Sequence, residues 1–224
     1  MEEYLAPTAF FDYEHPAVQA WVHGVTGQEQ NPVLQAIRLY KATRDGIRYN
    51  PYVFRPDPAT LSASYCLENE ESYCIPKGVL LGAACRSIGI PSRLGLADVK
   101  NHISSQQLID HLRSDIFVMH GFIELYLEGK WVKATPAFNA DLCTRMGVAP
   151  LEFNGREDSI FHEYGTDGAR HMEYLADHGT FADVPVDFIV QSVSKAYPHL
   201  VNTYLDQMNG HTLESDLAEV SAKA

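Results

Sequence analysis

The stretch from Cys74 to Arg93 restricts the fold of this chain more than any other part of the sequence. Pro76 suits a first helical turn, where its missing N–H has no partner to lose. Gly89 and Pro91 end a helix, the first by a left-handed turn and the second by blocking continuation. The spacing therefore predicts a helix of about 13 residues that begins at Cys74, with a strand from near Arg93. Apolar residues at helical spacing give it a face to bury: Val79, Leu80, Ala83, Ala84 and Ile88.

Cys74 stands out among the four cysteines because it is placed at the start of this predicted helix. A thiol there faces unpaired backbone N–H groups and the positive end of the helix dipole. Both favour the thiolate, which is the nucleophilic form. Cys66, Cys85 and Cys143 are irregularly spaced, without a Cys-x-x-Cys pair, so we expect four free thiols and not a disulfide framework.

A β-hairpin is predicted from Asp115 to Thr135, with a tight turn at Glu128-Gly129. That turn sets Tyr126 opposite Trp131 and Glu124 opposite Lys133, both favourable cross-strand pairs. The same register places Thr135 opposite Phe122 and diagonal to His120, on His120's face. Strict alternation predicts a separate core face made of Phe117, Met119, Ile123, Leu125 and Leu127.

Two motifs in these stretches resemble the transglutaminase-like superfamily, in its bacterial type. The first is Cys-x-x-Lys-Gly-x-Leu-Leu-x-Ala-x-x-Arg-x-x-Gly-Ile-Pro-Ser-Arg, from Cys74 to Arg93. The second is His-Gly-Phe-Ile-Glu-Leu-Tyr-Leu-Glu-Gly-Lys-Trp, from His120 to Trp131. They occur in the family's order and extend to about Pro136. The resemblance implies an α+β, papain-like fold in which the nucleophile helix packs on an antiparallel β-sheet.

The resemblance also implies a catalytic set of Cys74, His120 and a third residue at the position of Thr135. The family has aspartate there, within Trp-x-x-x-Asp-Pro, whereas this chain reads Trp131-Val-Lys-Ala-Thr135-Pro136. Threonine can accept a hydrogen bond from the imidazole but carries no charge. We therefore expect a less basic histidine and a weaker ion pair with the thiol. Three other residues could replace the aspartate: Asp141, Asn139 and Asp115.

The chemistry that such a set implies is acyl transfer through a thioester on Cys74, with His120 as acid and base. The oxyanion would be held by the backbone N–H of Cys74 and one group upstream. Candidates for that group are Tyr65, Asn69 and Tyr73. Arg93 is expected to anchor the start of its strand electrostatically and not to touch substrate.

The remaining elements are expected to support this core, in one domain spanning residues 1–224. The family motifs predict a core of about 47–139, and a polar stretch over Asp98–Ser114 is expected to cross the surface. Helices are predicted at 15–45 on the N-terminal side and in a segment of about 183–208 on the C-terminal side.

Charge and hydropathy exclude several partner classes. A formal net charge of -12 argues against a nucleic-acid surface and against binding to anionic membranes. No apolar run is long enough to span a bilayer. The first residues, Met1 to Leu5, lack the positive flank and apolar core of a secretory signal, which together with the free thiols predicts a cytoplasmic protein.

Three classes of function remain open. The first, which we favour, is a cysteine hydrolase or transferase acting on amides of a protein or peptide, as protease, deamidase or transglutaminase. The second is a binding module impaired by the missing aspartate. The third is a metal-binding protein centred on the polar stretch from His162 to His178. Its spacings match no standard ligand pattern, so we expect a solvated or substrate-lining loop, no metal and no cofactor. The sequence does not indicate an oligomeric state.

Overall fold

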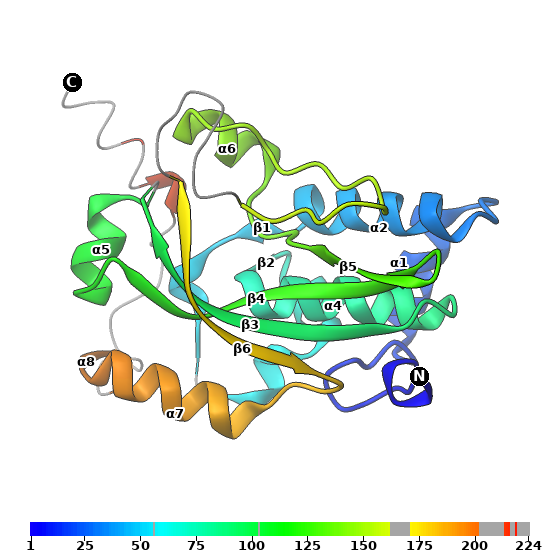
Figure 1. The fold of residues 1–224 in the computed structure, drawn as a ribbon, viewed down its shortest axis with the longest axis horizontal. Coiled ribbons are helices and arrows are strands. Elements are labelled where there is room, and N and C mark those ends of the chain that lie inside the picture. The colour runs from blue at the N-terminus through cyan, green and yellow to red at the C-terminus, as the bar shows by residue number, and fades with distance from the viewer. Residues whose placement is uncertain (56, 103, 162–170, 202–212, 216–217, 219–224) are drawn as a thin grey trace.

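Helix α4 (Cys74–Ser87) lies at the centre of the structure, a computed structural model that describes residues 1–55, 57–102, 104–161, 171–201, 213–215 and 218 (Figure 1). The helix begins at Cys74, as predicted. The sequence predicted one buried face, but thirteen of the fourteen residues are buried. Strands β3 and β4 pack on one side of α4 while α1, α2 and α3 pack against the others. A helix enclosed in this way is buried on all sides and not only along one stripe, and the buried residues include the charged Lys77 and Arg86.

The main sheet has four antiparallel strands in the order β5-β4-β3-β6. Its hairpin has the predicted register, with Tyr126 opposite Trp131 and Glu124 opposite Lys133. The α+β, papain-like fold class is therefore confirmed. The strands are β3 (Ser92–Asn101), β4 (Ile116–Leu127), β5 (Lys130–Ala134) and β6 (Met172–Phe181).

A β-bulge interrupts β4 just before His120. Two residues, Val118 and Met119, stand opposite the single residue Asp98 of β3. One extra residue shifts the alternation of side chains by one position. Phe117 and His120, which regular alternation would put on opposite faces of the sheet, therefore lie on the same face. The sequence analysis assumed unbroken alternation and put Phe117 on the opposite face. That assignment is wrong because the period-2 pattern carries no sign of the extra residue.

Arg93 joins the two sequence motifs. Its Nε donates to Glu124 at 2.7 Å, and its guanidinium stacks over the Trp131 ring with 4.1 Å to the ring centroid. A planar guanidinium can satisfy a carboxylate and an aromatic face together. Arg93 therefore anchors the start of β3 to the hairpin, which agrees with its expected role.

The N-terminal helices form where the sequence predicts them. Asn31 caps the second helix by accepting from the backbone N–H groups of Val33 and Leu34. A parallel pair of two-residue strands, β1 (Arg48–Tyr49) and β2 (Glu71–Ser72), then leads the chain to Cys74. The helices are α1 (Pro16–Thr26), α2 (Pro32–Gly46) and α3 (Ala63–Asn69), with 3-10 turns at Glu2–Tyr4, Pro51–Val53 and Pro58–Leu61.

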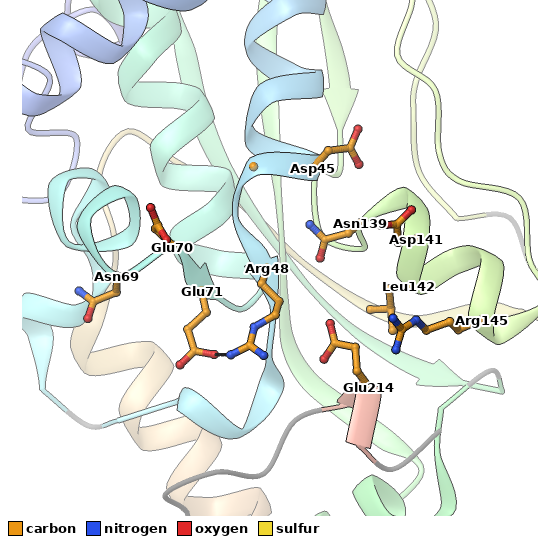
Figure 2. A pocket seen from close by; sticks show the side chains of 11 residues that line it. Asp45, Arg48, Asn69, Glu70, Glu71, Asn139, Asp141, Leu142, Arg145 and Glu214 are labelled. Atoms are coloured by element: carbon orange, nitrogen blue, oxygen red, sulfur yellow. Dashed lines mark hydrogen bonds and ion pairs between the residues drawn. The ribbon is translucent and has the colours of Figure 1, made fainter. Parts of the chain in front are cut away.

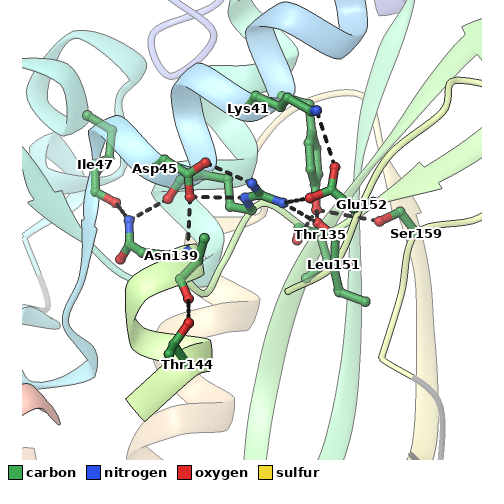
Figure 3. Close-up of polar contacts among 12 residues, drawn as sticks. Lys41, Asp45, Ile47, Thr135, Asn139, Thr144, Leu151, Glu152 and Ser159 are labelled. Carbon is green, nitrogen blue, oxygen red and sulfur yellow. Dashed lines mark hydrogen bonds and ion pairs between the residues drawn. The ribbon is translucent and has the colours of Figure 1, made fainter. Parts of the chain in front are cut away.

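The end of α2 is held by a buried polar network (Figure 3). The ammonium of Lys77, in α4, donates to the carbonyls of Arg44 and Ile47, and the amide of Asn139 donates to the same two oxygens. The Arg44 guanidinium in turn pairs with Glu152 at 2.9 Å. The network ties α2 and α4 to the chain that follows the hairpin.

Later parts of the chain hold more regular structure than predicted. Asp98–Ser114 is not only a surface crossing, because β3 continues to Asn101 and α5 (Gln106–Leu112) follows. The part of the His162–His178 stretch that the structure describes begins strand β6, whereas His162 lies outside the described residues. That 1–224 form one domain stays a prediction. The other helices are α6 (Ala140–Met146), α7 (Val186–Ala196) and α8 (Pro198–Val201), the last two within the predicted C-terminal segment.

Candidate active site

Cys74 occupies the first position of α4, directly after the N-cap residue Tyr73. Its Sγ accepts a hydrogen bond from the backbone N–H of Gly121 at 3.3 Å, and 8% of the residue is exposed. Burial raises the pKa of Cys74 to about 11, although the N–H groups of Gly121, Ile75 and Cys74 act in the opposite direction. The expected thiolate is therefore not favoured, because loss of hydration outweighs the helix terminus.

His120 lies in β4, 5% exposed, and lines the same cavity as Cys74. Burial lowers the pKa of its imidazole to about 4. In the described part of the chain, its Nε2 has no hydrogen-bond partner and no hydrogen bond joins its ring to the thiol. The two groups therefore rest as a neutral thiol and a neutral imidazole around neutral pH.

Thr135 directly follows β5 and is 1% exposed. Its backbone N–H donates to the carbonyl of Ser159 at 3.0 Å, and its carbonyl accepts from the Tyr40 hydroxyl at 3.2 Å. Its own hydroxyl has no partner among the described residues, like the Nε2 of His120. Thr135 thus follows the strand that pairs with β4, the strand of His120, but it does not line the cavity that Cys74 and His120 share. A role for Thr135 as third residue stays a prediction.

The three substitutes for the missing aspartate are engaged elsewhere. The Asn139 amide accepts from the N–H of Tyr49, besides its two bonds to carbonyls of the α2 end. Asp115 pairs with Lys100 at 2.7 Å. Asp141 is exposed at the start of α6 and lines a different pocket. No described hydrogen bond connects any of them to His120.

The cavity at Cys74 has a volume of about 90 Å³ and mostly apolar walls. Of the three predicted oxyanion candidates, Tyr73 lines it, whereas Tyr65 and Asn69 line a neighbouring pocket. The sequence analysis did not predict that α5, α7 and α8 contribute residues to the cavity wall, because their local sequence patterns do not indicate that they pack near Cys74. Apolar wall residues include Phe54, Ile75, Leu108, Phe117, Val193 and Leu200.

A larger and more polar pocket, of about 540 Å³, lies beside β1, β2 and α6 (Figure 2). It contains neither Cys74 nor His120. Arg48 pairs with Glu71 at its edge. Asp45, Asp141 and Arg145 also line it, and Figure 2 shows them around the opening. Since the described residues that line the larger pocket include no cysteine, serine, threonine or histidine, the smaller cavity at Cys74 is the candidate active site.

Two residues of the polar stretch pair with residues outside it and not with one another. His178 Nε2 lies 2.8 Å from Asp98, and Glu173 lies 3.7 Å from the Nε2 of His102. Across the described residues, no group of three or more His, Cys, Asp or Glu could hold a metal ion. The expectation that the protein needs no metal stays a prediction, because part of that stretch lies outside the description. Nor does any helix in the described ranges have the length and hydropathy to cross a membrane.

A buried helix with cysteine at its N-terminus, packed on an antiparallel sheet that carries histidine, defines a papain-like arrangement. Residues 19–136, just over half of the chain, match the sequence model of the transglutaminase-like superfamily, and the chain belongs to this superfamily. The resemblance of the two motifs is thereby confirmed. No curated protein matches the chain in sequence.

Two solved structures are similar to this chain at low sequence identity. A Cytophaga hutchinsonii protein, provisionally described as a cysteine protease, is 16% identical with a TM-score of 0.49, over 80% of this chain and 46% of that one. The chain thus spans about half the length of that protein. An arylamine N-acetyltransferase from Mycobacterium abscessus is 12% identical with a TM-score of 0.47, over 86% of this chain and 74% of its own.

Proposed function

We propose that the protein is a cysteine-dependent enzyme that hydrolyses or transfers the acyl group of an amide in a protein or peptide. The observation that carries the proposal is the joint placement of Cys74 and His120. Both side chains line one cavity, and the residue after His120 donates its N–H to the Cys74 sulfur at 3.3 Å. Membership of the transglutaminase-like superfamily supports the same chemistry.

In the proposed reaction the Cys74 sulfur forms a bond to the amide carbonyl carbon while His120 takes the thiol proton. The carbon–nitrogen bond then breaks, and His120 gives that proton to the departing amine. Water or an acceptor amine next attacks the thioester, losing a proton to His120, which returns it to the sulfur. The N–H groups around the sulfur, from Cys74, Ile75 and Gly121, are placed to stabilise negative charge.

The resting protonation states favour a base-assisted attack over a preformed ion pair. Burial holds the pKa of Cys74 near 11 and that of His120 near 4, so no charge exists before substrate arrives. Proton transfer from sulfur to imidazole therefore accompanies the attack. The uncharged Thr135 is consistent with this, because a permanent imidazolium would need a carboxylate nearby.

The mostly apolar walls of the cavity favour a substrate that has an apolar side chain next to the reacting amide. A cavity of about 90 Å³ with mostly apolar lining admits one modest aliphatic or aromatic group. A charged group there would lose its hydration without a partner. We therefore propose that peptides with leucine or a similar residue at this position are better substrates than peptides with glutamate there.

Cys74→Ser is expected to abolish covalent capture of a leucine-containing peptidyl ketone that alkylates catalytic thiols, with a loss of at least about 1,000-fold. Cys143→Ser is the matched control. Cys143 is also fully buried, and burial raises its pKa to about 11, but it lies in α6 outside the cavity. Intact-protein mass spectrometry followed by peptide mapping measures the adduct.

Equal capture by wild type and Cys74→Ser would contradict the proposal. So would adducts distributed over all four cysteines. A glutamate probe that reacts as fast as the leucine probe would contradict only the proposed side-chain preference.

Thr135→Asp is expected to raise the pKa of His120 by roughly one to two units, because a carboxylate within about 4–6 Å favours the imidazolium. Thr135→Val is the control, since it has nearly the same shape and adds no charge. NMR titration of the His120 ring measures the shift. A His120 pKa that is unchanged in Thr135→Asp would show that Thr135 does not stand in for the missing family aspartate.

The second candidate, a binding module without turnover, is favoured by two observations. The site has an uncharged residue where the family has aspartate, and Cys74 is only 8% exposed. The candidates differ in outcome, because a module binds peptides without forming a covalent adduct at Cys74. Protein or peptide partners, and a location in the cytoplasm, stay proposals under either function.

A further inference from the structure

The backbone directly before His120 is strained. Met119 has a φ of +58°, a left-handed conformation that a residue with a Cβ adopts rarely. The conformation is unfavourable for such a residue and persists only where neighbouring groups enforce it. Its position, one residue from the proposed base, raises the question of which groups enforce it.

Two side chains from other elements take the backbone groups that the bulge removes from the strand ladder. Asp98 of β3 accepts the N–H of Met119 at 3.0 Å through its Oδ1. Tyr197, at the end of α7, accepts the N–H of Val118 at 3.0 Å and donates to the carbonyl of Ile116 at 2.7 Å. The bulge is therefore held on both of its residues by a side chain and not by a strand.

Asp98 is itself fixed by β6. The Nε2 of His178 lies 2.8 Å from the same Oδ1, and the His178 ring packs edge-on against Phe188 with 5.5 Å between ring centroids. Both His178 and Tyr197 lie outside residues 19–136, the part that matches the superfamily. The support of the bulge is thus shared between Asp98, which lies within the matched part, and two residues of later elements of this chain.

We propose that Asp98 is a positioning residue for the active site, held by His178 and assisted by Tyr197. The peptide after Met119 sets the direction of the next two residues, and these are His120 and Gly121, whose N–H reaches the Cys74 sulfur. By holding Met119 in the left-handed conformation, the carboxylate directs both groups at the thiol. The effect of Asp98 on catalysis rests on the proposed function, whereas its effect on the backbone at Met119 and on the direction of His120 does not.

The primary test compares Asp98→Ala with Asp98→Asn in the full chain. Asparagine keeps an acceptor oxygen for the Met119 N–H, whereas alanine removes it. Asp98→Ala is expected to slow iodoacetamide alkylation of Cys74 by roughly 10- to 100-fold, the usual effect of an ångström-scale displacement. It is also expected to shift the ¹⁵N resonances of the His120 ring. Asp98→Asn should stay within about 3-fold of wild type and keep those resonances.

A second pair of variants separates positioning from general destabilisation. Met119→Gly and Met119→Ala both remove the buried Met119 side chain, but only glycine adopts a φ of +58° without strain. Asp98→Ala is then introduced into each background. Its effect on the His120 resonances is expected to be largely lost in the glycine background and to persist in the alanine background.

The proposal is overturned if Asp98→Ala leaves the His120 resonances unchanged or lowers only the melting temperature. It is also overturned if the effect is equal in both Met119 backgrounds. The ring resonances need no substrate, so they still report on Asp98 if no peptide probe is captured at Cys74. Failure of the proposed function and failure of this inference are therefore distinguishable.

Discussion

Gly121→Ala is expected to separate α4 from β4 and to inactivate the protein. A Cβ at Gly121 would lie 2.8 Å from Cγ1, 2.9 Å from Cα and 3.1 Å from N of Ile75. The Cα and N atoms belong to the backbone of the first turn of α4 and cannot rotate away, so helix and strand must move apart. We expect a loss of about 1–3 kcal/mol in the free energy of unfolding. Because the movement takes the Cys74 sulfur from the Gly121 N–H, capture of the peptidyl probe should fall by roughly 100-fold.

Gly78→Ala is the matched control, at the same interface. Its Cβ would find its nearest neighbour, the Phe122 carbonyl carbon, at 3.8 Å, which is ordinary contact. In a helix interior alanine is better than glycine by up to about 1 kcal/mol, so this variant should be at least as stable as wild type. Chemical denaturation and probe capture measure both variants. If Gly121→Ala retained wild-type capture, the close approach of α4 and β4 would not be needed for the site.

Lys77→Met is expected to change how stability depends on pH. Burial lowers the pKa of the Lys77 ammonium to about 7, from an ordinary value near 10.4. Between these values the unfolded chain binds a proton that the folded chain does not. Lys77 therefore contributes stability that is present above about pH 10.5 and is lost as pH falls to about 7. The change amounts to roughly 4–5 kcal/mol, at about 1.4 kcal/mol for each pKa unit.

The methionine variant removes this dependence without leaving bare carbonyls. The oxygens of Arg44 and Ile47 that Lys77 contacts also accept from the Asn139 amide. The measured quantity is the difference in unfolding free energy between wild type and Lys77→Met from pH 6 to pH 9. Higher pH is avoided because the buried cysteines then ionise in the unfolded chain and act in the opposite direction, and Lys77 itself lowers the pKa of Cys66 and Cys143, so their contribution would differ between the two proteins.

Exposed Lys130, in the hairpin, provides the control substitution, Lys130→Met. Folding does not remove it from water, so its difference curve should be flat. A flat curve for Lys77→Met as well would mean that the Lys77 ammonium keeps its charge inside the fold.

The parts of the site that the sequence predicts are those that depend on the spacing of a few neighbouring residues. Cys74 opens its helix because Pro76 and Gly89 fit its two ends, and the hairpin has its expected register because a two-residue turn permits one pairing. These patterns are properties of a few neighbouring residues. They place the thiol and the imidazole on the correct elements without reference to the remainder of the fold.

Features that depend on distant residues could not be predicted. At the bulge before His120, β4 donates hydrogen bonds to Asp98 and Tyr197, which lie about 20 and 80 residues away in the chain. For a related reason the sequence predicted a lowered pKa for the Cys74 thiol, whereas burial raises it. A helix terminus is visible in sequence, whereas the burial of Cys74 beneath α5, α7 and β4 is not.

The position of β3 between β4 and β6 has a consequence for synthesis on the ribosome. β3 ends at Asn101, but the strand that covers its second edge begins only at Met172. At typical rates the intervening chain takes on the order of 10 s to emerge, and during that time β3 has an unpaired edge open to other chains. His178 arrives with β6 and only then reaches Asp98. Under the proposed function, a nascent chain that already contains Cys74 and His120 would lack the His178 contact to Asp98 until β6 is in place, so its site would be assembled only after β6 has paired.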